Sequence, residues 1–320
     1  RPPRSTRKES SAASDVYKRQ GIIMDLQVFG HQSPDTDSTG SPIIWSWYLN
    51  EKKGLPAVPK LLGEPNTEAL FVLDRWGFEK PEIINRIIKG DSVVIVDTNN
   101  PAELPENIND ADIQGIIDHH KLVGGLETPG PIDITIRPLA CTATIMFDLM
   151  GEDVTDMPDP IKGLALSCIL SDTLEFRSPT TTSRDRVVAE QLAKELKIDI
   201  SNYASELFQA KSDVSDFSDV ELLRMDSKKY PIADLSFRVS VLETTEPNMI
   251  FRRKKSLIEA MKTVCEEDSV DHVLFFVVDI LREESTLFVP NENIKKVAEK
   301  SFGVNVLDDS VVLPGVVWCG

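Results

Sequence analysis

The sequence predicts an α/β protein, and three observations support that fold class. Short apolar runs alternate with amphipathic stretches over the first half of the chain, as in successive strand–helix units. Runs such as Val93–Val96 are continuous and β-branched, which is typical of strands buried on both faces of a parallel sheet. The 320 residues also suffice for two domains with separate cores. We therefore expect an N-terminal domain with a mostly parallel sheet flanked by helices, and a smaller C-terminal α/β domain.

The elements of the first domain follow from the apolar spacing, in chain order. Strands are expected at Leu26–Phe29, Val93–Val96 and Ile113–Ile117, and helices at Ser41–Asn50, Thr67–Trp76, Pro81–Ile88, Thr142–Met150, Pro160–Leu170 and Arg184–Leu196. The first helix is expected to start at Ser41 because Pro42 fits only the first turn of a regular helix.

The second domain has a different order of elements. We expect a helix at Asn248–Glu267 and strands at Phe237–Leu242, His272–Ile280, Thr286–Val289 and Val311–Val317. This order favours a mixed sheet, because strands that follow one another closely can pair antiparallel. The predicted domains are residues 21–210 and 219–320, joined by a linker at 211–218 within the polar stretch 198–218. Residues 1–20 are basic and serine-rich, and we expect a disordered or artefactual extension there.

The composition argues against several classes of function. A formal net charge of −17 argues against a nucleic-acid binder, because phosphate backbones are held by an excess of lysine and arginine. No apolar run approaches the length of about 18 residues that a membrane span needs. The four cysteines are scattered without paired spacing, which indicates neither a disulfide framework nor a zinc ribbon and fits a reducing cytoplasm.

Three of the four histidines lie in two short clusters with aspartates. The clusters are His31-Gln-Ser-Pro-Asp35-Thr-Asp37 and Asp118-His119-His120, and each directly follows an apolar run predicted to be a strand. Taken alone, the first cluster fits a polar loop whose aspartate caps a helix equally well. Adjacent histidines after a buried strand have no evident packing role. The second cluster therefore points more directly to metal binding.

Two further aspartates end predicted elements. Asp97 follows the strand Val93–Val96, and Asp172 closes an apolar helix, where its charge opposes the helix dipole. The carboxyl ends of parallel strands share one edge of the sheet, so these residues and both clusters are expected at one site. Aspartate with imidazole and no cysteine suits manganese, magnesium or cobalt. Two such ions about 3.5–4 Å apart, bridged by a carboxylate, would polarise a phosphate and generate hydroxide from water.

These residues belong to longer motifs that resemble the family II (manganese-dependent) inorganic pyrophosphatases of the DHH phosphoesterase superfamily. The resemblance runs from about Leu26 to Val317 and includes Phe29-Gly-His31-Gln-x-Pro-Asp35-Thr-Asp37-Ser, Val96-Asp97, Ile117-Asp118-His119-His120, Cys141-Thr-Ala-Thr-Ile145 and Ser171-Asp172-Thr-Leu-x-Phe-Arg-Ser-Pro-Thr180. It implies a DHH domain followed by a DHHA2-type domain, with the active site in the cleft between them. The implied activity is hydrolysis of pyrophosphate to two orthophosphates by a dinuclear centre that activates a bridging water or hydroxide.

The resemblance also implies a role for each matching residue. One Mn²⁺ would be held by His31 and Asp35 and the other by Asp37 and His119, while Asp97, as the bridge, and Asp172 complete the pair. His120 would contact the phosphate and act as an acid toward the leaving group, so that the implied catalytic residues are His120, Asp37 and Asp97. Asp118 would orient the histidines, and Lys228 would bind phosphate.

Partners and cofactors are implied in the same way. The family uses two Mn²⁺ per subunit, with Co²⁺ as an alternative and additional Mg²⁺ arriving with the substrate. Its members commonly pair as homodimers through the first domain, and neither a nucleic acid nor a membrane partner is expected.

The end of the chain departs from the family pattern. The family's Ser-Arg-Lys-Lys-Gln segment supplies an Arg-Lys clamp for the pyrophosphate, whereas this sequence continues Leu313-Pro-Gly-Val-Val317 with Trp318, Cys319 and Gly320. Two alternatives stay open, the first because these residues do not reveal a preference for phosphate chain length and the second because the clamp is missing. One is an exopolyphosphatase of the same superfamily. The other is a catalytically impaired protein that binds metal or phosphate. A nuclease of the superfamily is disfavoured, because the expected Gly-Gly-x-His motif is missing from the second domain and His272 lies in a predicted strand.

Overall fold

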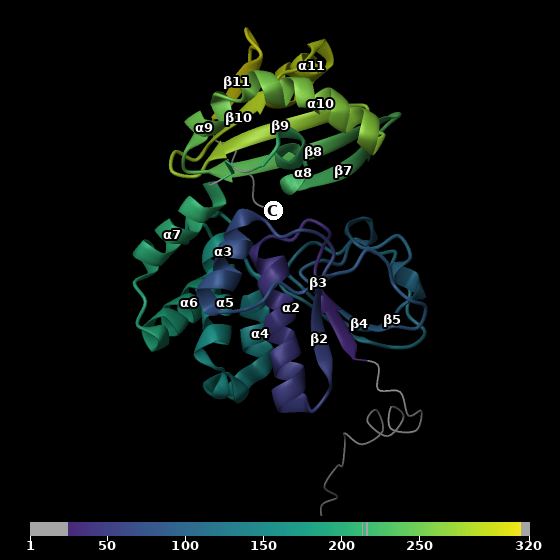
Figure 1. Cartoon of the computed structure of the whole chain (residues 1–320), viewed down its shortest axis with the longest axis vertical. Coiled ribbons are helices and arrows are strands. Elements are labelled where there is room, and N and C mark those ends of the chain that lie inside the picture. The colour runs from purple at the N-terminus through teal and green to yellow at the C-terminus, as the bar shows by residue number, and fades with distance from the viewer. Residues whose placement is uncertain (1–24, 213, 216, 315–320) are drawn as a thin grey trace, which may run out of the picture.

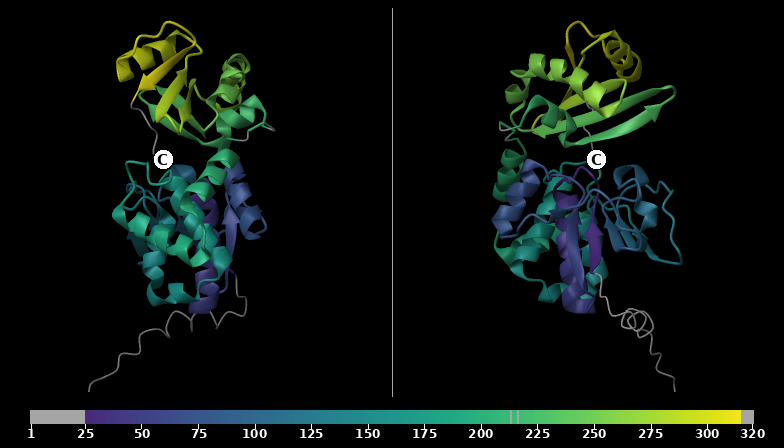
Figure 2. Two further views of the ribbon diagram at one scale, coloured as in Figure 1. Left: turned by 90° about the vertical axis from the view of Figure 1, so that its left-hand side faces the viewer. Right: turned by 45° about the vertical axis from the view of Figure 1, so that its right-hand side comes forward.

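The computed structural model describes residues 25–212, 214–215 and 217–314 and confirms the predicted α/β fold class (Figure 1). The N-terminal sheet is parallel and carries helices, and the C-terminal sheet is mixed. The two sheets belong to separate bodies stacked along the long axis of the molecule, as the rotated views in Figure 2 also show. The predictions for residues 1–20 and for Trp318–Gly320 lie outside the described residues.

The first sheet has six strands in the order β3-β2-β1-β4-β5-β6, and every neighbouring pair is parallel. Its strands are β1 (Leu26–Phe29), β2 (Ala57–Leu61), β3 (Glu82–Ile83), β4 (Ser92–Val96), β5 (Asp112–Asp118) and β6 (Asp133–Ile136). In this order the direction of strand addition reverses between β1 and β4. A crevice forms beyond the carboxyl ends of the strands at such a reversal, and ligands of open α/β sheets bind there.

Helices cover one face of this sheet, and loops with single helical turns cover the other. The helices are α2 (Thr36–Tyr48), α3 (Thr67–Trp76), α4 (Thr142–Met150), α5 (Asp159–Asp172), α6 (Ser183–Leu196) and α7 (Ile200–Ser212). The helical turns on the loop side are Pro101–Glu103 and Ile108–Asp110, whereas the turns at Leu49–Lys53 and Gly151–Asp156 continue α2 and α4. The largest core cluster joins the helices to the sheet, and a second cluster, which includes Phe29, Ile95 and Leu104, lies under the loops.

The second sheet has five strands in the order β11-β10-β9-β8-β7 and is mixed, because β8 and β9 are parallel while the other pairs are antiparallel. Its strands are β7 (Ser227–Ile232), β8 (Leu235–Thr244), β9 (His272–Asp279), β10 (Glu284–Phe288) and β11 (Ser310–Pro314). The helices α8 (Asp219–Met225), α9 (Pro247–Phe251), α10 (Lys254–Asp268) and α11 (Glu292–Phe302) pack on it. Among the described residues, no helix is long and apolar enough to cross a membrane.

Two sequence predictions for the first domain are wrong. Helix α2 starts at Thr36, not Ser41, because the side chain of Asp35 caps it and the helix continues through Pro42. Residues Pro81–Ile88 form no helix; Glu82–Ile83 is a strand paired with β2. Eight residues are too few for a helix to persist without strong packing, so the pairing at the sheet edge decides the conformation.

Several elements were not predicted, and one of them changes the connection between the domains. These are strands β2, β3, β6 and β7 and helices α7, α8 and α11; the strands and α8 are short, whereas Ile294 and Ala298 of α11 recur at helical spacing and were a usable signal. Residues 200–212, within the polar stretch expected to connect the domains, form helix α7, which buries Tyr203, Leu207 and Phe208. Because Leu207 and Phe208 follow Tyr203 by four and five positions, all three lie on one side of the helix, and the surrounding polar residues hide the pattern.

Candidate metal centre

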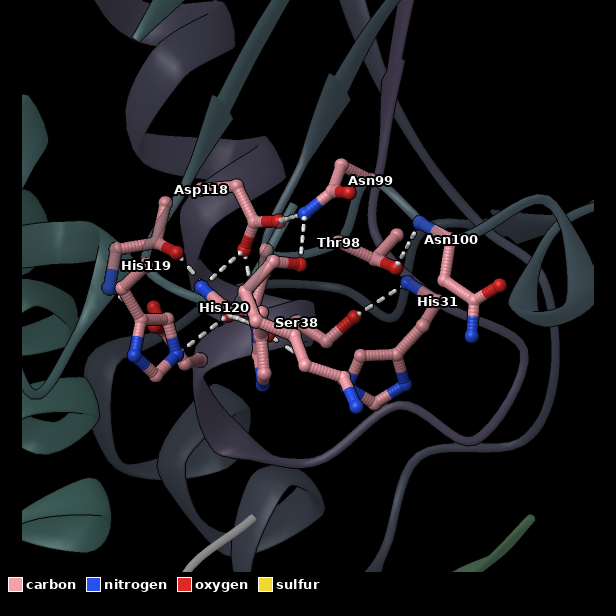
Figure 3. A network of polar contacts seen from close by, with 12 residues as sticks. His31, Ser38, Thr98, Asn99, Asn100, Asp118, His119 and His120 are labelled. Atoms are coloured by element: carbon pink, nitrogen blue, oxygen red, sulfur yellow. Dashed lines mark hydrogen bonds and ion pairs between the residues drawn. The ribbon is translucent and has the colours of Figure 1, made fainter. Parts of the chain in front are cut away.

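Several predicted site residues gather at the carboxyl ends of β1, β4 and β5, where the strand order reverses, and Figure 3 shows His31, Asp118, His119 and His120 among them. His31 follows β1, Asp97 follows β4, and Asp118 ends β5 just before His119 and His120. Their ligand atoms fall into three groups, each within 4.8 Å: His31 with Asp35 and Asp97; Asp97 with His119 and His120; and Asp37 with Cys141 and Asp172.

The loop from His31 to Asp37 is fixed by the start of helix α2. The backbone N–H of His31 donates to Ser38 Oγ at 2.8 Å, and Asp35 Oδ1 accepts the backbone N–H of Ser38 at 2.9 Å. Asp35 is therefore the helix cap and, with its other oxygen, lies 3.8 Å from His31 Nε2. Asp37 is 1% exposed and accepts hydrogen bonds from Ser41 Oγ and from the backbone N–H of Thr142, both at 2.6 Å.

Asp97 lies at the centre of the site and belongs to two of the three groups. It is 1% exposed, with Oδ2 lying 3.5 Å from His31 Nε2 and Oδ1 lying 3.2 Å from His119 Nε2. Its φ of 58° is in the left-handed region, which aspartate tolerates better than most residues. The backbone turn at the end of β4 thus directs the carboxylate toward histidines from both neighbouring strands.

The two adjacent histidines are held by different partners. Nδ1 of His119 lies 3.2 Å from the carbonyl oxygen of Leu139, so a proton on Nδ1 would leave Nε2 free to bind a metal. Nδ1 of His120 lies 2.9 Å from Oδ1 of Asp118. Asp118 is fully buried, and Asn99 Nδ2 donates to its other oxygen at 2.5 Å (Figure 3). Burial raises the pKa of Asp118, but these hydrogen bonds from His120 and Asn99 outweigh it and lower the pKa to about 2.

The carboxylates of the site repel one another. Burial and then the charges of Asp37 and Asp35 raise the pKa of Asp97 well above its ordinary value, and burial followed by the same neighbours does so for Asp172. Oδ2 of Asp172 is also buried, with no hydrogen-bond partner in the described part of the chain. A buried oxygen without a donor and an excess of negative charge are both relieved by a divalent cation, so the residues fit metal binding.

Comparison with known proteins supports the same conclusion. Residues 25–171 match the DHH family, N-terminal domain, and residues 205–318 match the DHHA2 domain. A Lactobacillus helveticus protein named as a manganese-dependent inorganic pyrophosphatase is 34% identical over 91% of this chain and 93% of its own length. A Deinococcus radiodurans protein of the same name is 38% identical over 87% of this chain and 90% of its own. This chain belongs to the manganese-dependent inorganic pyrophosphatase family.

Solved structures agree with that assignment. A crystal structure from Methanococcus jannaschii, assigned to the family II inorganic pyrophosphatases, has a TM-score of 0.80 at 30% identity and covers 92% of this chain and 95% of its own. The structure of an exopolyphosphatase-related protein from Bacteroides fragilis has a TM-score of 0.51 at 14% identity and covers 94% of this chain and 88% of its own. That second likeness concerns the fold alone.

In this member of the pyrophosphatase family, three residues without a role predicted from the sequence contact or lie beside the predicted site residues. Thr142, at the start of α4, donates from Oγ1 to Asp97 at 3.0 Å and from its backbone N–H to Asp37. Asn99 holds Asp118, and Cys141 groups with Asp37. The position of Thr142 and Cys141 in a long motif at a predicted helix start was a usable signal for both. Asn99, in a polar loop, gave no signal.

The family resemblance also placed Lys228, which lies across a cleft of about 740 Å³ from the metal-ligand candidates. The cleft is lined by residues of both domains, among them Asp35, His119, His120, Asp172 and Lys228. Nζ of Lys228 lies 3.1 Å from Oε1 of Glu103, and Glu103 Oε2 accepts the Thr98 hydroxyl at 2.8 Å. Glu103 was not singled out from the sequence, because its partner comes from the other domain.

Proposed function

We propose that this chain hydrolyses inorganic pyrophosphate to two orthophosphates in the cleft between its domains. The observation that carries the proposal is that Asp97 is shared by two groups of histidine and aspartate ligands, and that members of both groups line the same cleft as Lys228. Paired ligand groups that share one carboxylate suit two ions, and a lysine opposite them suits a phosphate at the other end of a short polyanion.

We assign two Mn²⁺ per subunit to these residues. His31, Asp35 and Asp97 would hold the first, and Asp37, Asp97, His119 and Asp172 the second, with Asp97 between them. The residues proposed for the second ion are divided between two of the groups, so their ligand atoms must draw together around it. When bound, such ions polarise the phosphate and lower the pKa of a coordinated water. We expect Co²⁺ to substitute for Mn²⁺ and additional Mg²⁺ to enter with the substrate.

The chain's own residues orient the substrate and move protons. Asp118 holds Nδ1 of His120, so Nε2 is the atom that can carry a proton toward the leaving phosphate. Lys228 supplies positive charge on the side of the cleft formed by the second domain, where its ammonium must leave Glu103 to meet a phosphate oxygen. Asp37 and Asp97, which we propose as catalytic with His120, are held rigidly by Thr142.

We further propose that the protein forms a homodimer through its first domain. Strand β6 is at the edge of the parallel sheet, and Ile134 on it is 53% exposed. Leu122 and Val123, in the segment before β6, are 72% and 50% exposed. An edge strand beside exposed apolar side chains is a ready surface for a second copy. The predicted domain boundaries at 210 and 219 and the cytoplasmic location stand as proposals from the sequence.

Phosphate release from pyrophosphate, measured with added Mn²⁺ and Mg²⁺, tests the function. We expect hydrolysis that is abolished by chelation and is much slower on tripolyphosphate. Faster release from tripolyphosphate would favour the exopolyphosphatase alternative, for which the Bacteroides fragilis neighbour gives only a fold-level argument. The chain should be assayed as given and with Ser-Arg-Lys-Lys-Gln placed after Val317. Absence of hydrolysis by both forms, with Mn²⁺ bound, would refute the proposal.

A further inference from the structure

Glu68 is a fully buried carboxylate that the proposed mechanism does not use. It lies in the first turn of α3 and is 0% exposed. Its Oε1 accepts hydrogen bonds from the hydroxyls of Thr36, at 2.5 Å, and Ser171. Buried carboxylates are rare and costly unless their hydrogen bonds and charge are compensated, so this one needs an explanation.

Capping of α3 does not explain Glu68. The N-cap of this helix is Asn66, whose side chain accepts the backbone N–H of Ala69 at 2.8 Å. A carboxylate that only offsets the helix dipole can stay exposed in the first turn. Glu68 instead directs both hydrogen bonds to other helices, across 32 and 103 positions of the chain.

The two hydroxyl donors lie next to the proposed metal ligands. Thr36 lies between Asp35 and Asp37 at the start of α2, and Ser171 precedes Asp172 at the end of α5. One oxygen of Glu68 therefore joins the two helix ends that carry three of the four aspartates of the site. A displacement of this oxygen moves both ends.

Lys211 connects Glu68 to the second domain. Lys211 lies near the end of α7, and its ammonium forms an ion pair with Glu243 of β8, whose side chain is 11% exposed. Burial lowers the pKa of Lys211, but the charges of Glu243 and then Glu68 outweigh it and raise the pKa. The carbonyl oxygen of Lys211 also accepts the hydroxyl of Thr67, which is adjacent to Glu68, at 3.4 Å.

Ser212 adds further hydrogen bonds between the end of α7 and the second domain. Ser212 Oγ accepts the backbone N–H of Thr245 at 2.7 Å and lies 3.0 Å from its hydroxyl, just beyond the end of β8. The end of α7 is thus fixed both to α3 of the first domain and to β8 of the second.

We propose that Glu68 is a positioning residue that fixes the relative placement of Asp35, Asp37 and Asp172, and that Lys211 couples this placement to the second domain. The inference rests on the proposed function in taking these aspartates as ligands of Mn²⁺, but it does not depend on which substrate is hydrolysed. Supporting residues of this kind commonly change metal affinity by about 10–100-fold when they are removed.

The test is Mn²⁺ binding to the purified full chain, followed by the electron paramagnetic resonance signal of free Mn²⁺. Glu68→Met keeps a side chain of similar length but removes both hydrogen bonds. We expect the affinity for Mn²⁺ to fall by about 10–100-fold, the range for such residues. Glu68→Gln keeps one acceptor oxygen and should recover part of the loss. Glu64→Gln is the matched control, because Glu64 is close in sequence but exposed and paired only with Lys80 among the described residues. Unchanged affinity in a folded Glu68→Met protein would overturn the proposal.

Separate variants keep the test decisive if Glu68→Met does not fold. Thr36→Val and Ser171→Ala each remove one donor, and each should weaken Mn²⁺ binding strongly in the chain with Glu68 and less in the Glu68→Gln chain, whose neutral amide oxygen is a weaker acceptor. Fully additive effects in this double-mutant cycle would contradict a shared clamp. Lys211→Met should also weaken Mn²⁺ binding, with recovery in Lys211→Arg. Because these measurements use no pyrophosphate, a wild-type chain that binds Mn²⁺ without hydrolysis would refute the proposed function alone.

Discussion

Replacing Asp97 with asparagine should change stability in opposite directions with and without metal. Asparagine has the same shape, tolerates the φ of 58° and can still accept the hydrogen bond of Thr142 Oγ1 at 3.0 Å. What it removes is one negative charge among buried carboxylates. The difference between wild type and variant therefore reports on charge, with little contribution from packing.

In the metal-free protein the charge of Asp97 is unfavourable at neutral pH. Burial and the charges of Asp37 and Asp35 raise its pKa well above the ordinary value, and each unit corresponds to about 1.4 kcal/mol. The substitution also removes one negative charge beside His31. Burial lowers the pKa of His31, but Asp35 and, to a smaller extent, Asp97 outweigh burial and raise the pKa to about 9. We expect Asp97→Asn to stabilise the metal-free protein by about 1–3 kcal/mol.

With Mn²⁺ bound, the wild type should be more stable than Asp97→Asn. At a Mn²⁺ concentration of about 100 times the wild-type Kd, each of the two proposed ions stabilises the wild type by about 2.7 kcal/mol, or about 5.4 kcal/mol for both. Removing a ligand shared by both ions should weaken each affinity by about 100-fold, since supporting residues alone cost about 10–100-fold, and this leaves the variant about 0.4 kcal/mol of metal stabilisation per ion. This loss exceeds the advantage of about 1–3 kcal/mol that the variant has without metal.

Urea denaturation at neutral pH, with chelator or with Mn²⁺, measures both effects. Asp234→Asn, in the exposed turn between β7 and β8, is the control and should change neither value. The reasoning fails if Asp97→Asn is less stable than wild type in chelator, or if Mn²⁺ stabilises both proteins equally. Elemental analysis adds a direct check, because unchanged metal content in the variant would count against a shared bridging ligand.

Three further predictions concern packing, titration and the cleft. A Cβ at Gly30 would lie 2.0 Å from Ser38 Oγ, so Gly30→Ala should destabilise the chain by about 1–3 kcal/mol in urea and weaken Mn²⁺ binding. Burial raises the pKa of Tyr203 to about 12, so between pH 10, the ordinary tyrosine value, and pH 12 the folded form keeps a proton that the unfolded form loses; stability should fall by about 3 kcal/mol across that window. Burial raises the pKa of Glu103, but Lys228 outweighs it and lowers the pKa, so the ion pair persists at neutral pH. Glu103→Gln should free Lys228 and tighten binding of inorganic phosphate by about 1 kcal/mol, or about fivefold, in calorimetric titration.

Each of these has a control or a contradicting result. Gly130→Ala should be neutral, since no heavy atom lies within 4 Å of the added Cβ. In spectrophotometric titration, Tyr203→Phe should remove a transition near pH 12, and a titration curve unchanged by this substitution would exclude the assignment. Weaker phosphate binding by Glu103→Gln would show that Glu103 places Lys228 productively and does not compete with the substrate.

The first domain was largely predictable because its strands are continuous apolar runs. Val93–Val96 and the strand before Asp118 are buried on both faces, and such runs allow few other structures. Pro81–Ile88 was not predictable, because its apolar residues fit a helix as well as an edge strand and only pairing with β2 decides between them. The two interpretations of Asp35, helix cap and metal ligand, do not exclude each other. Its Oδ1 accepts the backbone N–H of Ser38, and its Oδ2 lies beside His31 in the proposed site.

The metal site was predictable as a set of residues but not as a geometry. Aspartate and histidine after buried strands indicate one edge of the sheet, whatever the strand order is. The left-handed turn at Asp97 and the support from Thr142 depend on how β4 meets α4 in space. Glu68 illustrates the limit best. In sequence it is an ordinary glutamate in the first turn of an amphipathic helix, and nothing local shows that it is fully buried.

The sequence by itself therefore determined the fold class, the family and the side chains available for metal binding, because strand periodicity and the residues at strand ends are local properties of the chain. Only the tertiary structure decided the strand order that brings β1 beside β4, the pairing of Lys228 with Glu103, and the hydrogen bonds that join Glu68 to Thr36 and Ser171. The physical reason is that burial and charge pairing arise from segments distant in the chain. Their energies depend on which segments meet, and local spacing carries no information about that.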